Sequence, residues 1–93
     1  MAEDFFVEVD EATVRRERTK ARELRASQWW KRRCAEGVCH YCGRQVGNKA
    51  LTMDHLVPLI RGGRSNKGNL VPACKDCNNR KQNKLAFEFP VAD

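Results

Sequence analysis

Residues 39–78 read CHYCGRQVGNKALTMDHLVPLIRGGRSNKGNLVPACKDCN, and this stretch decides the fold. It opens and closes with a Cys-x-x-Cys pair. Two cysteines separated by two residues can bind one tetrahedral zinc ion, and two such pairs complete a four-thiolate structural site. The chain has five cysteines, an odd number, and its sequence shows no export signal, so a set of disulfides is disfavoured. We therefore predict structural Zn²⁺ bound by Cys39, Cys42, Cys74 and Cys77.

The length and charge of the chain narrow its function class. A chain of 93 residues is too short for a large hydrophobic core, so a metal site would add stability that packing alone does not supply. Its 18 Lys and Arg residues outnumber its 12 Asp and Glu residues, and four of the acids lie in the first ten positions, which hold no base. The rest of the chain is strongly basic. That balance favours a nucleic-acid partner over a merely soluble basic surface.

The N-terminal third predicts a basic helical arm. Asp10 is a suitable N-cap, and from Glu11 to about Cys34 the sequence has no Gly or Pro and is rich in strong helix formers. We expect one long helix that docks along a narrow apolar seam, with Trp29 and Trp30 as docking residues. The alternative is a charged helix that only covers the domain. The arginines expected to contact DNA phosphates are Arg15, Arg18, Arg22, Arg25, Arg32 and Arg33.

The middle of the chain predicts two short strands. Residues 50–56 alternate weakly between apolar and polar and are expected to form a strand that ends near His55. An exposed loop rich in Gly and Arg follows at 58–67. Residues 69–72 predict a second strand, because Pro72 disfavours a helix interior.

A final helix is expected over about residues 74–84. Each helical residue advances by about 100°, so Cys74 and Cys77 can both reach one metal ion, whereas Asn78 faces sideways. Further basic residues of the loop and helix are DNA-contact candidates: Arg61, Arg64, Arg80 and Lys81. Residues 1–9 are expected to form either a short strand or a segment that packs Phe5 and Phe6 on the body. In the tail, Phe87 and Phe89 are expected to alternate onto a core face.

Strand, loop, strand and helix, with an Asp-His pair on the first strand and an Asn on the helix, form a ββα-metal arrangement. The residues that carry the pattern are Asp54, His55, Pro58, Gly62, Gly63, Asn66, Asn69, Leu70, Cys74, Cys77, Asn78 and Lys81. With them the chain resembles the HNH endonuclease family over about residues 37–84, and its four cysteines resemble the zinc-containing branch of that family. The resemblance implies an α+β fold, a small ββα-metal (HNH) domain with a four-cysteine structural zinc site. We expect residues 1–36 to form an N-terminal segment and basic helical arm, and residues 37–93 to form the nuclease domain.

The resemblance also implies a role for each site residue. His55 would be the general base, and Asp54 would ligate the catalytic metal. Asn69 would position the segment that bears the base, and Asn78 would be the metal ligand from the helix. The family usually has His at that last position, but this chain has only two histidines, and the other, His40, is expected to be exposed and structural. Some zinc-containing phage resolving endonucleases are similar in placing Asn directly after the last zinc cysteine.

The chemistry of phosphodiester hydrolysis supports these roles independently. The reaction needs an attacking water, a base with a pKa near neutrality and a cation against the developing charge. An imidazole suits the base, and a carboxylate with an amide oxygen suits Mg²⁺ or Mn²⁺. The alternative is that Asp54 and His55 are a hydrogen-bonded pair at a strand end in a module without catalytic activity.

We therefore predict a metal-dependent HNH endonuclease that hydrolyses DNA phosphodiester bonds, with structural Zn²⁺ and catalytic Mg²⁺ or Mn²⁺. The expected substrate is double-stranded DNA, branched DNA included, and the expected state is a monomer that nicks one strand at a time.

No apolar run approaches the ~18 residues of a membrane span, so we expect no membrane contact and a location in the cytoplasm of a bacterial or phage-infected cell. Two alternatives remain: a non-catalytic zinc module that binds nucleic acid, and a zinc-knuckle adaptor for a protein partner.

Overall fold

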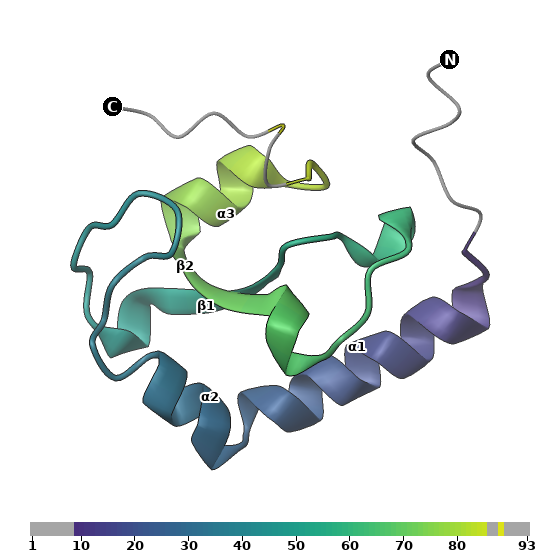
Figure 1. The fold of residues 1–93 in the computed structure, drawn as a ribbon, viewed down its shortest axis with the longest axis horizontal. Coiled ribbons are helices and arrows are strands. Elements are labelled where there is room, and N and C mark those ends of the chain that lie inside the picture. Colours follow the sequence, from purple (N-terminus) through teal and green to yellow (C-terminus); the bar gives the residue numbers. More distant parts are fainter. Residues whose placement is uncertain (1–8, 86–87, 89–93) are drawn as a thin grey trace.

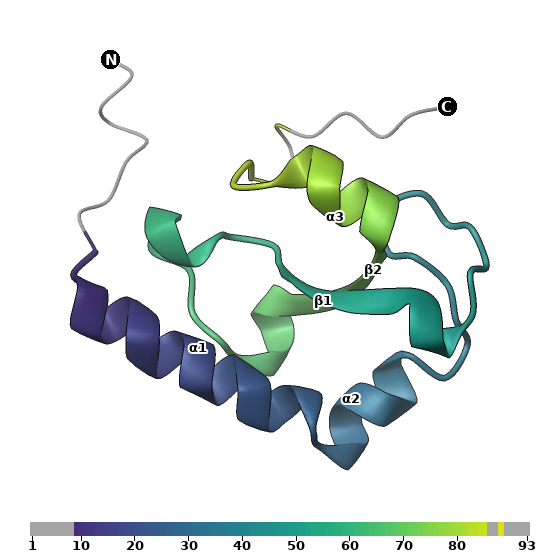
Figure 2. The same ribbon diagram turned by 180° about the vertical axis from the view of Figure 1, so that it is seen from behind.

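A two-stranded antiparallel sheet lies at the centre of the molecule, with helices on two sides of it (Figure 1). The structure is a computed structural model that describes residues 9–85 and 88. Strands β1 (Leu51–His55) and β2 (Leu70–Cys74) form the sheet. Helix α3 (Lys75–Lys81) lies on one side of it, and helices α1 (Glu11–Arg25) and α2 (Gln28–Arg33) lie on the other, as the opposite view also shows (Figure 2). The predicted α+β architecture is confirmed.

Both sides of β2 are covered, and all five of its residues are buried. On one side Ala73 packs with three of the metal-site cysteines. On the other side Leu70 packs with Trp30 and Cys34 from the α2 region. Leu51 of β1 contacts both clusters. The docking role predicted for Trp30 is confirmed, since only 6% of this residue is exposed.

The N-terminal arm differs from its prediction. Asp10 caps the first turn as expected, but the single helix predicted as far as Cys34 is wrong. It is interrupted at Ser27, whose hydroxyl donates to Leu24 O at 2.5 Å and accepts from Trp30 N at 3.3 Å. Serine competes well for backbone groups and is a favoured N-cap, so one side chain ends α1 and starts α2. The break lets α2 turn, and Trp30 thereby reaches the core.

The later elements lie close to their predicted positions. The strand pair is confirmed, although β2 continues to Cys74, and Pro72 lies within it opposite Met53. A proline is tolerated there because a strand of a two-stranded sheet has one edge without a partner strand. The final helix ends at Lys81, earlier than predicted, because Gln82 adopts a φ of 49° that a helix cannot continue.

Three short 3₁₀ turns connect these elements: Asn48–Ala50, Leu59–Arg61 and Lys67–Asn69. The expectations for Phe5, Phe6, Phe87 and Phe89 concern residues outside the described part of the chain. Among the described residues, no helix has the length and hydrophobicity that crossing a membrane requires.

Candidate metal centre and active site

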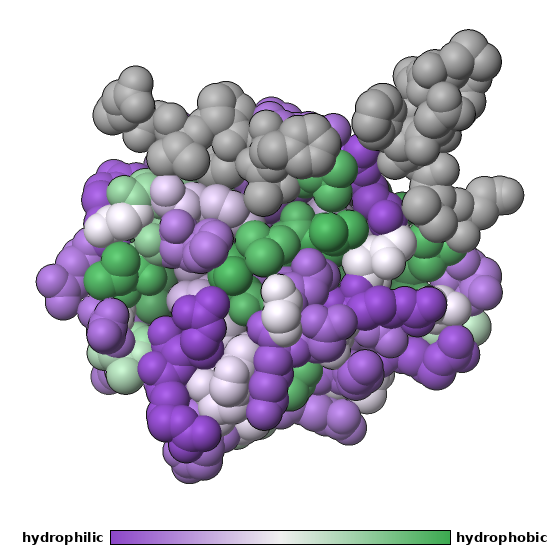
Figure 3. Space-filling view, in the orientation of Figure 1, coloured by the Kyte–Doolittle hydropathy of each residue, from purple (hydrophilic) through white to green (hydrophobic). Residues whose placement is uncertain are grey.

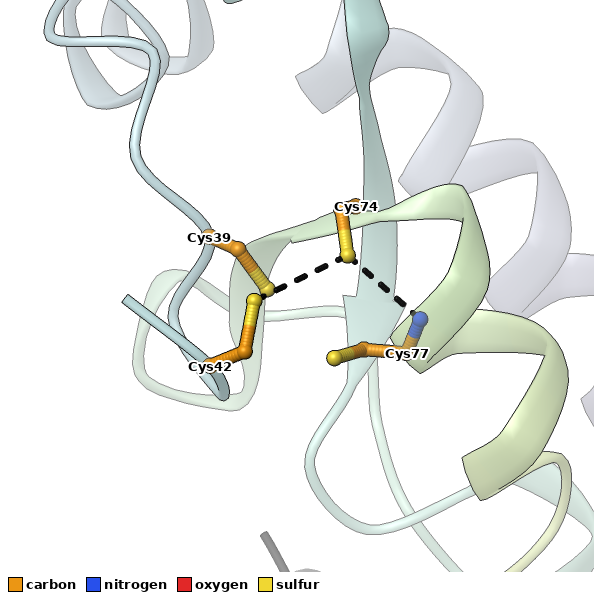
Figure 4. A group of neighbouring side chains, drawn as sticks. All are labelled: Cys39, Cys42, Cys74 and Cys77. Atoms are coloured by element: carbon orange, nitrogen blue, oxygen red, sulfur yellow. Dashed lines mark hydrogen bonds between the residues drawn. The ribbon is translucent and has the colours of Figure 1, made fainter. Parts of the chain in front are cut away.

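The four cysteines of the two pairs lie together where the end of β2 meets α3, and their side chains point toward one another (Figure 4). All four sulfur atoms lie within 4.8 Å of one another, and the Sγ atoms of Cys42 and Cys74 are 3.9 Å apart. Sulfurs around a tetrahedral ion with bonds of about 2.3 Å would be separated by about 3.8 Å. The group formed by Cys39, Cys42, Cys74 and Cys77 could therefore hold a structural metal ion, as the sequence predicts.

The surroundings of these sulfurs favour a bound cation. Arg44 Nε lies 3.2 Å from Cys42 Sγ, and this hydrogen bond lowers the pKa of the Cys42 thiol to about 6. Burial, together with the neighbouring sulfurs, raises the pKa of Cys77 to about 12. Several thiolates crowded into a buried site repel one another unless a cation lies between them. The fifth cysteine, Cys34, belongs to the other side of β2 and takes no part in this group.

The first cysteine pair also reaches the predicted active site, through the tyrosine inside it. The Tyr41 hydroxyl donates a hydrogen bond to Asp54 Oδ2. Burial, followed by this hydrogen bond, raises the pKa of Tyr41, so the phenol stays protonated and remains a donor. The metal-site loop and the carboxylate of β1 are thus directly connected.

Asp54 is also paired with a buried lysine. Lys81 Nζ lies 3.2 Å from Asp54 Oδ2 and donates to His55 O at 2.9 Å. No part of Lys81 is exposed. The predicted contact of Lys81 with DNA is therefore wrong: an ammonium group held between a carboxylate and a carbonyl in the interior cannot reach a phosphate at the surface.

A hydrogen bond to one ring nitrogen orients the imidazole of His55. Its Nε2 lies 2.9 Å from the hydroxyl of Ser65, a fully buried residue of the loop between the strands. Burial lowers the pKa of His55; the charge of Asp54 opposes this effect, and that of Lys81 adds to it. The imidazole is therefore neutral at pH 7, the form that a general base requires.

Asn69 fixes the segment that follows His55. Its Oδ1 accepts from Val57 N at 2.8 Å, and its Nδ2 donates to Val57 O at 3.0 Å and to Arg64 O at 2.8 Å. Its own carbonyl accepts from Leu56 N at 2.9 Å. These four bonds tie the end of β1 to the loop, and they are what the predicted positioning role requires.

Asn78 projects from α3 toward β1. The Thr52 hydroxyl donates to Ala73 O at 2.9 Å, so its oxygen must accept from Asn78 Nδ2, which lies 2.7 Å away. This assignment leaves the Asn78 amide oxygen as the atom that could bind a metal. A cavity of about 250 Å³ is lined by Asp54, His55 and Asn78, with Arg18 of α1 among the other lining residues.

The arginines predicted to contact DNA occupy different surroundings. Arg15, Arg18, Arg22 and Arg25 are exposed along α1, and Arg32 and Arg33 are exposed on α2. Arg64 is exposed and lies 3.7 Å from Glu17, whereas Arg80 is exposed and lies 4.0 Å from Asp76. In Figure 3, hydrophilic side chains dominate the region of α1 and α2. The prediction that Arg61 contacts DNA is wrong. Only 9% of its side chain is exposed, and its Nη1 lies 2.5 Å from Glu88 Oε1.

Sequence reasoning missed the partners that surround the site. Tyr41, Lys81 and Ser65 contact Asp54 or His55. Lys81 belongs to the family pattern, but the sequence did not reveal its partner, and nothing in the local sequence distinguishes Tyr41 or Ser65 from ordinary polar residues. Glu17 did carry a signal: it lies four residues before the buried Ala21, on the docking side of an otherwise basic helix. An acidic residue at that position predicts a specific buried partner.

Comparison with known proteins agrees with this geometry. Residues 39–84 match the family model described as HNH endonuclease. This part of the chain belongs to the HNH endonuclease family. The chain is also similar to the CRISPR-associated endonuclease Cas9 of Actinomyces naeslundii, with 44% identity over 47 residues. The matched segment is 50% of this chain and 4% of that protein, so the chain spans only a small part of the relative's length. Residues 39–84 are therefore a nuclease domain of the HNH family, and α1 and α2 precede it.

The buried pair of Lys81 and Asp54 yields a prediction on stability. In the Lys81→Met variant the carboxylate stays buried without its cation and His55 O loses its donor. We expect the free energy of unfolding to fall by about 3–5 kcal/mol, the usual cost of breaking a buried ion pair on one side. Denaturant unfolding with zinc present measures this, with Lys84→Met at an exposed position as the matched control. Equal stabilities of the two variants would contradict a structural role for the pair.

Proposed function

We propose that the chain is a metal-dependent HNH endonuclease that hydrolyses DNA phosphodiester bonds. The observation that carries this proposal is the convergence of Asp54, His55 and Asn78 on one cavity that Arg18 also lines. Membership of the HNH family and the similarity to a Cas9 endonuclease support the reaction class. A nucleic acid is the substrate that the basic composition also favours. As one cavity serves one strand at a time, a monomer would nick.

The non-catalytic alternative is less well supported. It interprets Asp54 and His55 as a hydrogen-bonded pair, but within the described part of the chain each has other partners. Asp54 contacts Tyr41 and Lys81, whereas His55 contacts Ser65. The adjacent side chains are held separately, as expected of groups with different tasks.

Asp54 and Asn78 are the residues that would hold catalytic Mg²⁺ or Mn²⁺. Among the described residues, both polar contacts of the Asp54 carboxylate involve Oδ2, and Asn78 donates through Nδ2, so each retains an Oδ1 as a hard ligand. The ion would supply positive charge against the phosphate and leaving oxygen. Because Lys81 already neutralises Asp54, the protein offers little net negative charge to the metal ion. We therefore expect the substrate phosphate to supply the remaining negative ligands.

His55 would accept the proton of the attacking water. It is neutral at pH 7, borders the cavity and is fixed at Nε2, which are the requirements for a base that must be ready before substrate binds. Asn69 would keep it in place through the bonds to Val57 and Arg64 described above.

The arm would bind DNA beside this cavity. On a helix, the side chains of Arg15, Arg18, Arg22 and Arg25 fall within a sector of about 80°, next to the side that carries Glu17 and Ala21. This row of exposed arginines would follow a phosphate backbone, and Arg18 would bring the phosphates to the cavity. We propose residues 1–36 as the arm and residues 37–93 as the nuclease domain on which it docks.

The zinc prediction concerns Cys74. We propose Zn²⁺ as the ion of the four-cysteine group, since four thiolates in a tetrahedral arrangement are typical of structural zinc. Cys74→Ser should abolish the folded state, because structural zinc contributes about 10–16 kcal/mol to folding in small metallo-domains. Cys34→Ser is the matched control and should keep one tightly bound zinc per chain. Elemental analysis with circular dichroism measures both; a folded, zinc-free parent protein would contradict the assignment.

The His55 prediction tests the function itself. His55→Ala should lower the rate of plasmid cleavage with Mg²⁺ or Mn²⁺ by about 10²–10⁴-fold, the usual contribution of a general base. Zinc content and DNA affinity should stay near the parent values. His40→Ala removes the other histidine, which is exposed, and should cleave normally. Cleavage by His55→Ala at the parent rate would rule out the proposed active site.

The pH profile provides a second measurement on His55. Burial lowers its pKa below the ordinary value of about 6.5, so the neutral base persists to lower pH than a free imidazole would. The cleavage rate should be maximal above this lowered pKa and should decrease as the pH falls through it. A decrease with its midpoint above about 6.5 would contradict the burial argument.

The Arg18 prediction tests the interface. Arg18→Ala should weaken DNA binding and reduce the slope of log affinity against log salt by about 0.9, the value for one phosphate contact. Arg16 is the matched control: it is two positions away and about 200° around the helix, and it bonds Thr13. Equal effects of Arg16→Ala and Arg18→Ala would mean that the binding reports overall charge and not a directed row of arginines.

A further inference from the structure

A hydrogen-bonded chain runs from helix α1 to His55, and neither the family match nor the proposed metal ligands account for it. Ser65, which is fully buried, donates from its hydroxyl to Glu17 O at 2.5 Å and from its backbone N to Glu17 Oε1 at 2.6 Å. The same hydroxyl oxygen lies 2.9 Å from His55 Nε2. Glu17 lies outside the matched residues 39–84. The helix thus contacts the base through one intervening side chain.

The protons in this chain can be assigned from its chemistry. A backbone carbonyl only accepts, so the single hydroxyl proton of Ser65 is given to Glu17 O. The Ser65 oxygen can then only accept from His55, and Nε2 must carry a hydrogen. A neutral imidazole has one N–H, so Nδ1 holds the lone pair.

The burial of Glu17 supports a specific task. Only 7% of this residue is exposed, although the helix around it is basic and its neighbours Arg16 and Arg18 are exposed. Burying a carboxylate costs free energy unless other contacts compensate for the lost water. Here the Ser65 amide donates to Oε1, and Arg64 Nη1 lies 3.7 Å from Oε2. Glu17 therefore makes two contacts with Ser65, one from its backbone and one from its side chain. Together they hold the Ser65 hydroxyl in one orientation.

We propose that Glu17 and Ser65 are positioning residues that hold His55 as the Nε2–H tautomer and direct its Nδ1 to the attacking water. This inference rests on the proposed function. In the step it serves, the proton of the water moves to Nδ1 as the water oxygen bonds to phosphorus. The leaving oxygen departs with the electron pair of the broken P–O bond and takes a proton from solvent. Helix α1 is then part of the active site as well as a DNA-binding arm.

The tautomer can be measured in the unmodified zinc-bound protein. Imidazole ¹⁵N chemical shifts distinguish Nε2–H from Nδ1–H, and the chain has only two histidines, so His40→Gln assigns the signals. At a pH well above the pKa of His55, we expect the Nε2–H form to predominate. In Ser65→Ala the acceptor is lost, and the signals should shift toward a mixture of tautomers. A predominant Nδ1–H form in the parent protein would overturn the inference without any variant of the chain.

Cleavage kinetics test the role of Glu17. Glu17→Gln keeps an amide oxygen that can accept from Ser65 N, so its rate at saturating DNA should stay within about threefold of the parent rate. Glu17→Ala and Ser65→Ala should lower that rate by about 10–100-fold, with DNA affinity unchanged, as expected when a supporting hydrogen bond is lost. Glu23→Ala, at an exposed position of the same helix, is the matched control and should have no effect.

The two proposals fail in different ways. If Glu17→Ala and Ser65→Ala cleave at the parent rate with an unchanged tautomer while His55→Ala is inactive, the positioning role is wrong and the proposed function stands. If His55→Ala itself cleaves normally, the proposed function fails. A purely structural role would lower the melting temperature of Glu17→Ala and Glu17→Gln alike and leave the tautomer unchanged, which would also overturn the positioning role.

Discussion

The convergence of four sulfur atoms is the constraint on which the rest of this structure depends. It joins a loop that precedes β1 to the end of β2 and the start of α3, segments more than thirty residues apart, as in the Cys42–Cys74 contact of 3.9 Å. A metal ion there would do more than add stability to a small core. Because Tyr41 lies between two of the cysteines and donates to Asp54, the geometry of the metal-site loop sets the geometry of a carboxylate on the next strand. The candidate metal centre and the proposed active site are thus connected through one phenol group.

The active site is assembled from charges that are balanced in the interior. Lys81 neutralises Asp54 and also donates to His55 O, so one buried ammonium group contacts both residues of the Asp-His pair. This arrangement places a positive charge beside the carboxylate, so the cavity is less negative than the carboxylate alone would make it. The two side chains also have different partners: the Asp54 carboxylate contacts the Lys81 ammonium group and the Tyr41 hydroxyl, whereas the His55 ring contacts the Ser65 hydroxyl. A site built in this way would admit phosphate, which a more acidic cavity would repel.

The sequence was most informative where function depends on spacing along the chain. The two cysteine pairs, the strand that bears Asp54 and His55, and the placement of Asn78 one residue after Cys77 were all predictable, because short-range geometry determines them. Two kinds of contact were not predictable: local competition for backbone groups, and contacts between segments far apart in the sequence. Ser27 interrupts the arm because its hydroxyl competes for backbone groups, and a run of strong helix formers conceals that competition. Lys81 appeared to be a surface cation because its helix is basic, and only the folded chain shows that it points inward.

The long-range character of the site has a consequence for biosynthesis. The groups that surround the cavity come from successive parts of the chain: α1, the first cysteine pair, β1, the loop that holds Ser65, and finally α3. A chain is made from its N-terminus, and its contacts form only after both partners have left the ribosome. Asp54 has no buried cation until Lys81 is made, and the group of four sulfurs is incomplete until Cys77 is made. A nascent chain that ends before α3 thus contains the proposed base but neither the proposed metal ligand from the helix nor the complete scaffold. A domain of this design would therefore complete its proposed active site only once α3 has been made.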